Sequence, residues 1–333
     1  MYNREPFTQY LPKDYDIGTS AKPQEILKIF SKSQIIGKRF PIVHVYVGNR
    51  VIEVSTFRGR EELDGVIPEN FGTPYEDANR RDLTINSLFY DIQNEVIIDY
   101  TGGLKDIKNK IIRTIGDPLL RFKQDPVRML RAIRHSARLS FSITEETWEA
   151  ILLKKNLIRT VAKERLRDEI LKDIEGNYIN SWFNLLKKSG LLYETYPFIK
   201  KFEKNKAISY KLLNRIFIQL EKSNFSKEER VCIFLYGFLG IINKSSFVQN
   251  WRKVPTFERE ELLKFFWKFF FTFRFARKFF EESMDIFVDA VKLFYLLYHQ
   301  HPISKKYRRK KHYKNSLKIA KFLLNTLNSK VVD

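Results

Sequence analysis

Short apolar runs of strand length dominate the first 115 positions of the chain. The pattern predicts β-strands over 40–47, 51–57, 96–99 and 110–114. Gly48-Asn49-Arg50, between the first two runs, is typical of a hairpin turn. An extended segment ends at Asp16, because the helix-start residues Thr19-Ser20 and Pro23-Gln24-Glu25 follow it. Polar residues with glycines and prolines over 59–79 predict a loop or flap.

Beyond Gly116 the apolar residues recur at helical spacing instead. Asp125-Pro126, an N-cap residue followed by proline, predicts a helix over 125–139. The same spacing predicts helices over 162–175, 179–188, 211–221, 227–241, 257–280, 281–298 and 314–325. The sequence therefore predicts an α+β fold, in which a mixed α/β part is followed by an all-helical remainder.

Composition limits the class of protein further. With 333 residues, 44% of them apolar, the chain is long enough for two or three domains and a sizeable core. Its single cysteine, Cys232, lies in an apolar run, which excludes a disulfide framework and predicts a buried thiol in the cytoplasm. Met1–Tyr10 lacks the apolar core of a secretory signal, and the most apolar stretch, 265–280, carries four Lys and Arg. No membrane anchor and no particular oligomeric state are expected.

Charge is divided unevenly along the chain. Residues 1–100 hold 12 Lys and Arg against 15 Asp and Glu, net −3, whereas residues 101–333 hold 48 against 24, net +24. A long cationic surface joined to an acidic part predicts a polyanionic partner such as RNA or DNA. The alternative is a lysine-rich composition with solvated faces.

Asp14 and Asp16 are the first candidate for chemistry. Two aspartates one residue apart on an extended segment direct both carboxylates to the same side, where they can bind divalent cations. Glu53, on the second strand of the hairpin, is a candidate third carboxylate. A pair of such cations serves in-line phosphoryl transfer. The alternative for Asp-x-Asp is a solvated turn, and Glu53 alone is typical of a solvent-facing position.

Two polar faces are candidates for nucleotide binding. Arg128, Arg131, Arg134 and Arg138 lie within one third of the circumference of the predicted helix 125–139. Four arginines without an interleaved acid require a negative partner, which phosphates would supply. Asp82, Asn86 and Tyr90 fall at i, i+4 and i+8, which would place them on one helical face. Solvated polar faces are the alternative in both cases.

A basic segment lies near the end of the chain. Residues 305–314 hold seven Lys and Arg with two interleaved tyrosines, a composition that suits a phosphate backbone with bases stacked on rings. The predicted RNA-binding residues are Lys305, Lys306, Arg308, Arg309, Lys310 and Lys311. A solvated basic linker is the alternative.

Several of these segments together resemble the bacterial class II nucleotidyltransferases, which comprise CCA-adding tRNA nucleotidyltransferases and poly(A) polymerases. The resemblance covers about Leu11 to Glu175 in the family's motif order. It rests on Asp14-x-Asp16, Ile52-Glu53-Val54, Arg80-Arg81-Asp82-Leu83-Thr84-Ile85-Asn86, Asp99-Tyr100-Thr101-Gly102-Gly103-Leu104-Lys105-Asp106 and Asp125-Pro126-Val127-Arg128-Met129-Leu130-Arg131-Ala132. The family pattern implies a head of the polymerase-β type over 1–115, a helical neck over 116–175, and a helical body with a basic tail over 176–333.

The resemblance also implies roles for single residues. Asp14 and Asp16 would hold two Mg²⁺ ions. Residues that would contact the ribose and triphosphate, or lie near them, are Arg80, Arg81, Asp82, Asn86, Arg131 and Arg134. Residues that match the flexible motif at the hinge between head and neck are Asp99, Gly102, Gly103, Asp106 and Arg113. Asp125 and Arg128 match the pair that recognises the base: a carboxylate accepts from an exocyclic amine and a guanidinium donates to a ring nitrogen, a pattern that adenine and cytosine offer.

Two features depart from the family pattern. Gln124 stands where the family usually has Glu, which is expected to loosen the orientation of Arg128. A Gly-Gly-x-Val-Arg-Asp loop, which precedes the aspartate pair in the family and cradles the triphosphate, is absent from Met1–Pro12. We interpret this as a late start of the chain or an altered N-terminus, and either is expected to impair catalysis.

The expected activity is template-independent transfer of AMP from ATP to an RNA 3′ end, because residues 35–45, with Gly37-Lys38-Arg39-Phe40, resemble the poly(A) polymerase branch. CCA addition to tRNA from CTP and ATP is the alternative, since Arg165–Glu169 resembles that branch. RNA binding by a non-catalytic relic is a second alternative. The expected partners are the 3′ end of an mRNA or tRNA and a nucleoside triphosphate.

Overall fold

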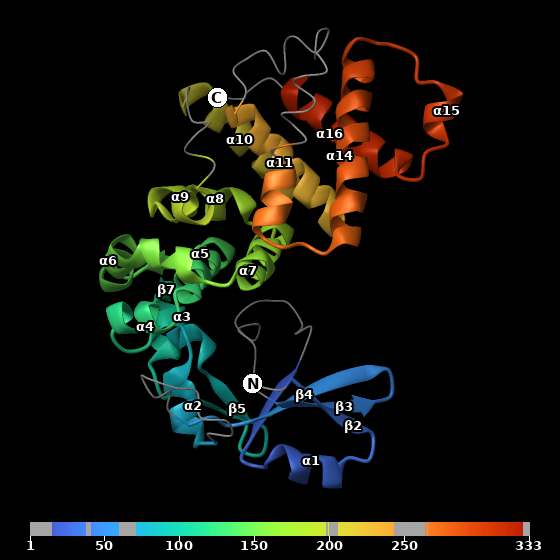
Figure 1. Ribbon diagram of the computed structural model, residues 1–333. Coiled ribbons are helices and arrows are strands. Elements are labelled where there is room, and N and C mark those ends of the chain that lie inside the picture. Colours follow the sequence, from blue (N-terminus) through green and yellow to red (C-terminus); the bar gives the residue numbers. More distant parts are fainter. Residues whose placement is uncertain are drawn as a thin grey trace. The chain divides into compact units, whose positions relative to one another are not determined.

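The computed structural model describes residues 15–37, 41–59, 71–197, 199, 206–242, 264 and 266–328. The chain divides into two compact units, residues 1–154 and 155–333, each of which is described by itself (Figure 1). The sequence-based division at 115 and 175 stays a prediction. None of the helices among the described residues is long and apolar enough to cross a membrane.

A four-stranded sheet forms the first part of unit 1 (Figure 1). Its strands lie in the order β1 (Asp16–Thr19), β4 (Arg50–Thr56), β3 (Ile42–Val47) and β2 (Ser33–Ile36), and only the β1–β4 pair is parallel. Helix α1 (Pro23–Ile29) covers one face, where Ile26 packs in a cluster with Val43, Val45 and Val54. Because neighbouring residues of a strand point to opposite faces, Glu53 lies on the face that α1 leaves uncovered.

The second part of unit 1 carries short elements. They are α2 (Pro74–Arg80), η2 (Thr84–Asn86), β5 (Phe89–Asp91), β6 (Val96–Ile98), α3 (Gly103–Lys108), β7 (Ile111–Ile112), α4 (Pro118–Gln124), α5 (Val127–Leu139), β8 (Ser142–Ile143) and α6 (Glu145–Lys154). The loop expected over 59–79 is wrong for residues 74–79, since Thr73 caps α2 with its side chain and Pro74 occupies the first turn. The common helical face expected for Asp82, Asn86 and Tyr90 is also wrong, since Tyr90 lies on β5.

Unit 2 is helical among its described residues. Its elements are η3 (Lys155–Thr160), α7 (Lys163–Glu175), α8 (Ile179–Lys188), α9 (Leu191–Thr195), α10 (Lys206–Glu221), α11 (Lys227–Ile242), α14 (Arg277–Tyr298), α15 (Lys305–Arg308) and α16 (Tyr313–Asn328). Stacked and tilted rings, including Trp182, Phe217, Phe234 and Phe269, fill its core. The α+β fold class is confirmed.

One helix boundary predicted in unit 2 is wrong. The sequence pattern divides one helix from the next at residues 280 and 281, whereas α14 begins at Arg277, after a turn in which Arg274 has a φ of 50°. The buried thiol is confirmed: Cys232 has no exposed surface, its Sγ donates to the Ser283 carbonyl at 3.2 Å, and desolvation raises its pKa.

Candidate active site

Carboxylates lie side by side on the uncovered face of the sheet. The expectation that the extended segment ends at Asp16 is wrong, since β1 begins at this residue and runs to Thr19. Asp16 is the register partner of Glu53 on the parallel strand β4, and directly paired residues share a face. His44 of β3 is the partner of Glu53 on its other side, with Nε2 3.4 Å from Glu53 Oε1. Asp14 lies outside the described residues. Among the described residues, no group of three His, Cys, Asp or Glu side chains is arranged to hold a metal ion.

Asp77 links β4, the strand that carries Glu53, to Arg80 and Arg81 at the end of α2. Its Oδ1 accepts from the backbone amide of Arg58, just beyond β4, at 3.3 Å. The same carboxylate accepts from Arg80 Nη1 at 3.4 Å and from Arg81 Nε and Nη2 at 3.2 and 2.7 Å. Arg81 also lies over the Phe89 ring, 5.3 Å from its centroid. This buried aspartate therefore orients both predicted nucleotide-binding arginines.

Three other predicted nucleotide-binding residues meet beside this segment. Asn86 Nδ2 donates to Asp82 Oδ1 at 2.9 Å, and Arg131 Nη1 of α5 lies 3.6 Å from Asp82 Oδ2. The predicted proximity of Asp82 and Asn86 is thus present, although a single 3₁₀ turn between them provides it rather than a long helix. Amide, carboxylate and guanidinium groups are held together at a point where α5 meets the end of α2.

The predicted base-recognition pair is preformed. Arg128 Nε lies 4.0 Å from Asp125 Oδ2, while Asp125 Oδ1 accepts from the Val127 amide at 3.2 Å. Arg128 Nη2 donates to the carbonyl of Arg80 at 3.4 Å. Arg128 and Arg134 are both buried, so the interpretation of this helix face as solvated is wrong for these two residues. Gln124 Oε1 accepts from Arg121 Nη1 at 3.5 Å, and so contacts Arg121 rather than Arg128.

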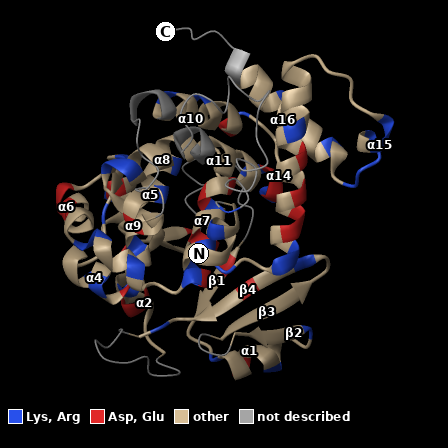
Figure 2. Cartoon of the chain, turned by 45° about the horizontal axis from the view of Figure 1, so that its top comes forward, with Lys and Arg blue, Asp and Glu red and all other residues tan. Residues whose placement is uncertain are grey.

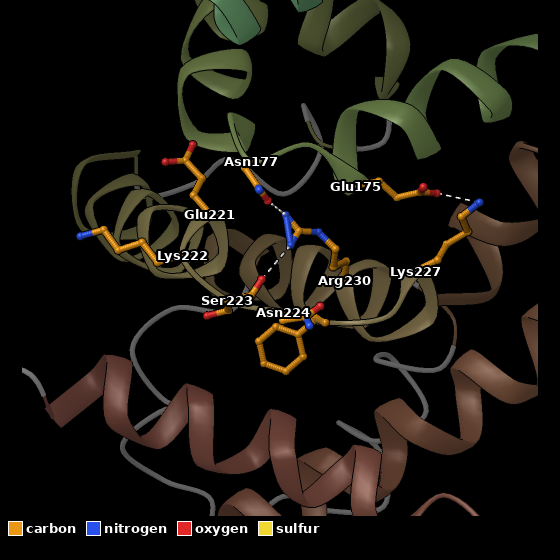
Figure 3. A pocket seen from close by; sticks show the side chains of 9 residues that line it. Glu175, Asn177, Glu221, Lys222, Ser223, Asn224, Lys227 and Arg230 are labelled. Carbon is orange, nitrogen blue, oxygen red and sulfur yellow. Dashed lines mark hydrogen bonds and ion pairs between the residues drawn. The ribbon is translucent and has the colours of Figure 1, made fainter. Parts of the chain in front are cut away.

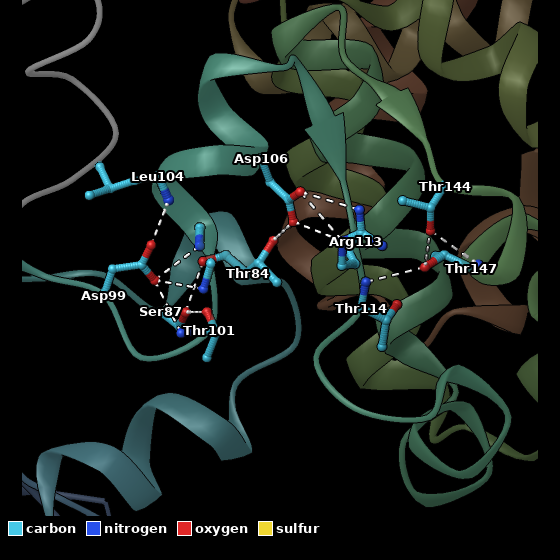
Figure 4. A network of polar contacts seen from close by, with 12 residues as sticks. Thr84, Ser87, Asp99, Thr101, Leu104, Asp106, Arg113, Thr114, Thr144 and Thr147 are labelled. Atoms are coloured by element: carbon cyan, nitrogen blue, oxygen red, sulfur yellow. Dashed lines mark hydrogen bonds and ion pairs between the residues drawn. The ribbon is translucent and has the colours of Figure 1, made fainter.

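The predicted hinge residues form a network around the start of α3 (Figure 4). Asp99 accepts from four successive backbone amides, 101–104, at 2.9–3.1 Å. Gly102 has a φ of 81°, and a Cβ on Gly103 would clash with the Thr84 carbonyl, so both positions require glycine. Asp106 Oδ2 accepts from Thr84 Oγ1 at 2.7 Å and from Arg113 Nε at 3.1 Å. The segment joins η2, α3 and β7 within unit 1.

Unit 1 thus combines exposed carboxylates on a sheet with a connected group of arginines, acids and an amide. This arrangement suits a nucleoside triphosphate, because guanidinium groups bind phosphate oxygens and the Asp125–Arg128 pair presents one acceptor beside one donor.

Comparisons with known proteins show the family to which this chain belongs. The model of the poly(A) polymerase head domain matches residues 4–113, and the model described as the probable RNA- and SrmB-binding site of polymerase A matches residues 140–203. Poly(A) polymerase I of Escherichia coli O157:H7 is 38% identical over 205 residues, which are 57% of this chain and 44% of that protein. The chain belongs to the bacterial class II nucleotidyltransferase family.

CCA-adding enzymes are also among the relatives of this chain. The CCA-adding enzyme of Bacillus velezensis (strain DSM 23117 / BGSC 10A6 / LMG 26770 / FZB42) is 35% identical over 251 residues, 72% of this chain and 59% of that enzyme. The chain spans about half the length of the curated relatives that it matches. The crystal structure of the Bacillus stearothermophilus CCA-adding enzyme in complex with CTP has a TM-score of 0.71 at 23% identity, and covers 98% of this chain and 72% of that one. This likeness shows a shared fold.

The basic segment 305–314 lies between α14 and the body of α16 in unit 2. Figure 2 shows acidic residues on α14 and basic residues on α15. Tyr307 is buried and donates to Asp289 Oδ1 at 2.6 Å, so the expectation that it stacks on bases is wrong. Lys310 Nζ lies 2.6 Å from the same oxygen, and Lys311 Nζ lies 3.8 Å from Glu282. Within 305–311, the exposed cations for which the described residues provide no ion-pair partner are Lys305, Lys306, Arg308 and Arg309.

A pocket of about 440 Å³ lies in unit 2 between the ends of α7 and α10 and the start of α11 (Figure 3). Its buried Arg230 donates to the carbonyls of Ile174, Gly176, Leu220 and Ser223 and to Asn177 Oδ1, at 2.9–3.4 Å. Lys227 Nζ pairs with Glu175 at 2.7 Å. Because the guanidinium uses its five N–H groups on the protein itself, the pocket offers a ligand no arginine donor.

Sequence patterns missed two residues of the unit 1 site. Asp77 precedes Arg80 and Arg81 by three and four positions, which is the spacing of helical ion pairs and could have indicated it. Arg121, whose Nη2 donates to the Arg80 and Arg81 carbonyls, lies about forty positions away from them. No local spacing could have indicated that contact.

Proposed function

We propose that this protein transfers AMP from ATP to the 3′ hydroxyl of an RNA without a template. One observation carries the proposal. The sheet carboxylates Asp16 and Glu53 belong to the same compact unit as Arg80 and Arg81 at the end of α2. The hydrogen bond from the Arg58 amide to Asp77 joins the two groups. Phosphoryl transfer requires both groups, because charge develops on the phosphate oxygens while the attacking hydroxyl must lose its proton.

The donor set fits magnesium ions. Asp16 and Glu53 are carboxylates on adjacent strands, and Mg²⁺ prefers such oxygen ligands. The spacing of Asp14 predicts a carboxylate on the same side of the strand as Asp16. Bound Mg²⁺ would supply neutralisation of the charge on the phosphoryl oxygens. We propose Asp14, Asp16 and Glu53 as its ligands, and His44 would hold the Glu53 carboxylate from the opposite side.

The arginine group would bind and orient the nucleotide. Arg80, Arg81 and Arg131 would place positive charge beside the triphosphate, and Asp82 with Asn86 would accept from and donate to the ribose hydroxyls. Asp125 would accept from an exocyclic amine while Arg128 donates to a ring nitrogen. Adenine and cytosine offer this combination, whereas guanine and uracil do not.

CCA addition to tRNA is the second candidate, and a specific observation favours it. The sequence similarity to the CCA-adding enzyme of Bacillus velezensis covers 72% of this chain, whereas the sequence similarity to poly(A) polymerase I covers 57%. The Asp125–Arg128 pair suits ATP and CTP equally. A tRNA lacking its CCA and an unstructured RNA, each incubated with ATP and then with ATP plus CTP, separate the candidates. Long adenosine tails on both RNAs support the first proposal, and addition that stops after C, C and A on tRNA alone supports the second.

The catalytic assignment is tested by incorporation of labelled ATP. Asp14→Ala, Asp16→Ala and Glu53→Ala are each expected to lose roughly 10²–10³-fold or more in rate, because charge neutralisation is removed from the transition state. Glu149→Ala changes an exposed carboxylate on α6 and is the matched control. Unchanged incorporation by Asp14→Ala and Asp16→Ala would remove the assignment. Salt-sensitive RNA binding by a wild-type chain that incorporates neither ATP nor CTP would identify a non-catalytic RNA-binding protein instead.

We further propose that the exposed cations of the 305–309 segment contact the RNA backbone, and that the hinge network around Asp99 joins head and neck at about residue 115. The lone buried thiol of Cys232 supports a reducing, cytoplasmic location.

A further inference from the structure

Arg121 of α4 lies behind the proposed nucleotide site and belongs to none of the recognised motifs. Its Nη2 donates to two consecutive carbonyls, those of Arg80 at 2.5 Å and Arg81 at 2.6 Å. Its Nη1 contacts Gln124 Oε1 at 3.5 Å. These contacts tie α4 to the Arg80-Arg81-Asp82 segment.

The two carbonyls that Arg121 binds are at the C-terminal end of α2. The last carbonyls of a helix have no partner within the helix and carry the negative end of its dipole, so a guanidinium there is both a donor and a favourable charge. A planar fork can reach both carbonyls with one nitrogen while its other nitrogen contacts Gln124, whereas an ammonium group cannot reproduce that geometry.

Arg128 shares one of these carbonyls. Its Nη2 donates to the Arg80 carbonyl at 3.4 Å, while its Nε lies 4.0 Å from Asp125. The longer distance shows that Arg121 is the main donor to this carbonyl. Without Arg121, the Arg80 and Arg81 carbonyls would lose that donor, and Arg128, which already contacts the Arg80 carbonyl, could replace it. Such a movement would draw Arg128 away from Asp125.

We propose that Arg121 is a positioning residue for base selection: it occupies the carbonyls at the end of α2 and thereby leaves Arg128 aligned with Asp125. This inference rests on the proposed function, because it assigns the Asp125–Arg128 pair to the nucleotide base. In this proposal Arg121 acts through Arg128 and not by contact with the substrate.

The experiment compares Arg121→Ala, Arg121→Gln and Arg121→Lys with the wild-type chain. Direct binding of ATP and GTP is measured by calorimetry, incorporation is measured as kcat and KM, and thermal unfolding is followed in parallel. Arg121→Ala and Arg121→Gln are expected to lower the preference for ATP over GTP by on the order of tenfold to a hundredfold, because small misplacements in a site have effects of this size. KM is expected to rise more than kcat falls. Lys123→Ala, an exposed position on the same helix, is the control.

Added guanidinium ion separates positioning from a purely structural role. Millimolar guanidinium is expected to restore part of the ATP preference of Arg121→Ala and to leave the ATP preference of Lys123→Ala unchanged. Loss of stability with an unchanged ATP preference in Arg121→Gln and Arg121→Lys would overturn the positioning role, even if Arg121→Ala does not fold. A wild-type chain that shows no preference between ATP and GTP would overturn the proposed function itself.

Discussion

Both units place arginines on the carbonyls that end a helix, but the surroundings of these arginines differ. In unit 2, Arg230 donates to carbonyls at the ends of α7 and α10, and all of its N–H groups bind the protein. In unit 1, Arg121 and Arg128 donate to the end of α2, and the half-buried carboxylate of Asp125 lies beside Arg128. The same contact therefore closes a junction in one unit, and in our proposal it aligns a pair of groups for base recognition in the other.

The two arginines, Arg230 and Arg128, differ in the polar groups that surround them. Burial lowers the pKa of Arg230, and the nearby charges of Glu175 and Glu221 oppose that effect. The Arg230 guanidinium donates to acceptors inside the protein. Arg128 is also buried, yet it shares a carbonyl with Arg121 and lies beside the Asp125 carboxylate, which accepts from the Val127 amide. We expect a buried arginine to take part in substrate recognition when an acid lies beside it, because the two groups together can accept from and donate to a base.

The largest expected effect is on stability in unit 2. Arg230→Met would leave four carbonyls and the Asn177 side chain without their donor, and is expected to lower the free energy of unfolding by about 3 kcal/mol. Urea unfolding of the full chain measures this change. Lys227→Ala removes an exposed ion pair from the same pocket and is expected to cost less than about 1 kcal/mol. Equal losses in both variants would contradict the role assigned to Arg230.

Asp125→Ala is the matched test in unit 1. Loss of the carboxylate acceptor is expected to reduce the preference for ATP over GTP by about 10- to 100-fold, since an unpaired polar group costs about 1–3 kcal/mol. Stability is expected to fall by only about 1 kcal/mol, the value of the hydrogen bond to the Val127 amide. Nucleotide-binding calorimetry and urea unfolding measure the two effects. A large loss of stability with unchanged selectivity would make Asp125 a structural residue like Arg230.

The sequence predicted local features of this molecule better than contacts between distant segments. Helix 179–188 was predicted at its observed limits, and the proximity of Asp82 to Asn86 followed from their spacing. The helix over 74–80 was missed because glycines and prolines dominate the surrounding 59–79 segment, although Thr73 and Glu76 form a capping box there. Arg121 and Arg230 could not be assigned, since the carbonyls that they bind belong to segments up to 56 positions away.

The 305–311 segment extends the comparison to surface cations. Replacing Lys305, Lys306, Arg308 and Arg309 by Gln is expected to weaken RNA binding about tenfold at low salt. The slope of log affinity against log salt is expected to fall by about 3, because each neutralised phosphate of a single strand contributes about 0.7. Filter binding over a salt series measures both quantities.

A control with the same number of neutralised charges comes from elsewhere in unit 2. The exposed lysines that it replaces by Gln are Lys222, Lys264, Lys268 and Lys278. An equal loss of salt dependence in the two variants would show that net charge alone attracts RNA, and the solvated-linker interpretation of 305–311 would then hold.

The smallest expected effect concerns Gln124, whose amide oxygen contacts Arg121 at 3.5 Å. Gln124→Glu would replace this neutral acceptor by a carboxylate, and charge-assisted hydrogen bonds are shorter and stronger. Because the residue is exposed, solvent screens the gain, and the KM for ATP is expected to fall by only about two- to fivefold. The same substitution in the Arg121→Ala background is expected to have no effect on KM, since its partner is absent. An equal improvement in both backgrounds would show that the carboxylate acts on Arg128 directly, as the family resemblance suggests, and that Arg121 is not the intermediary.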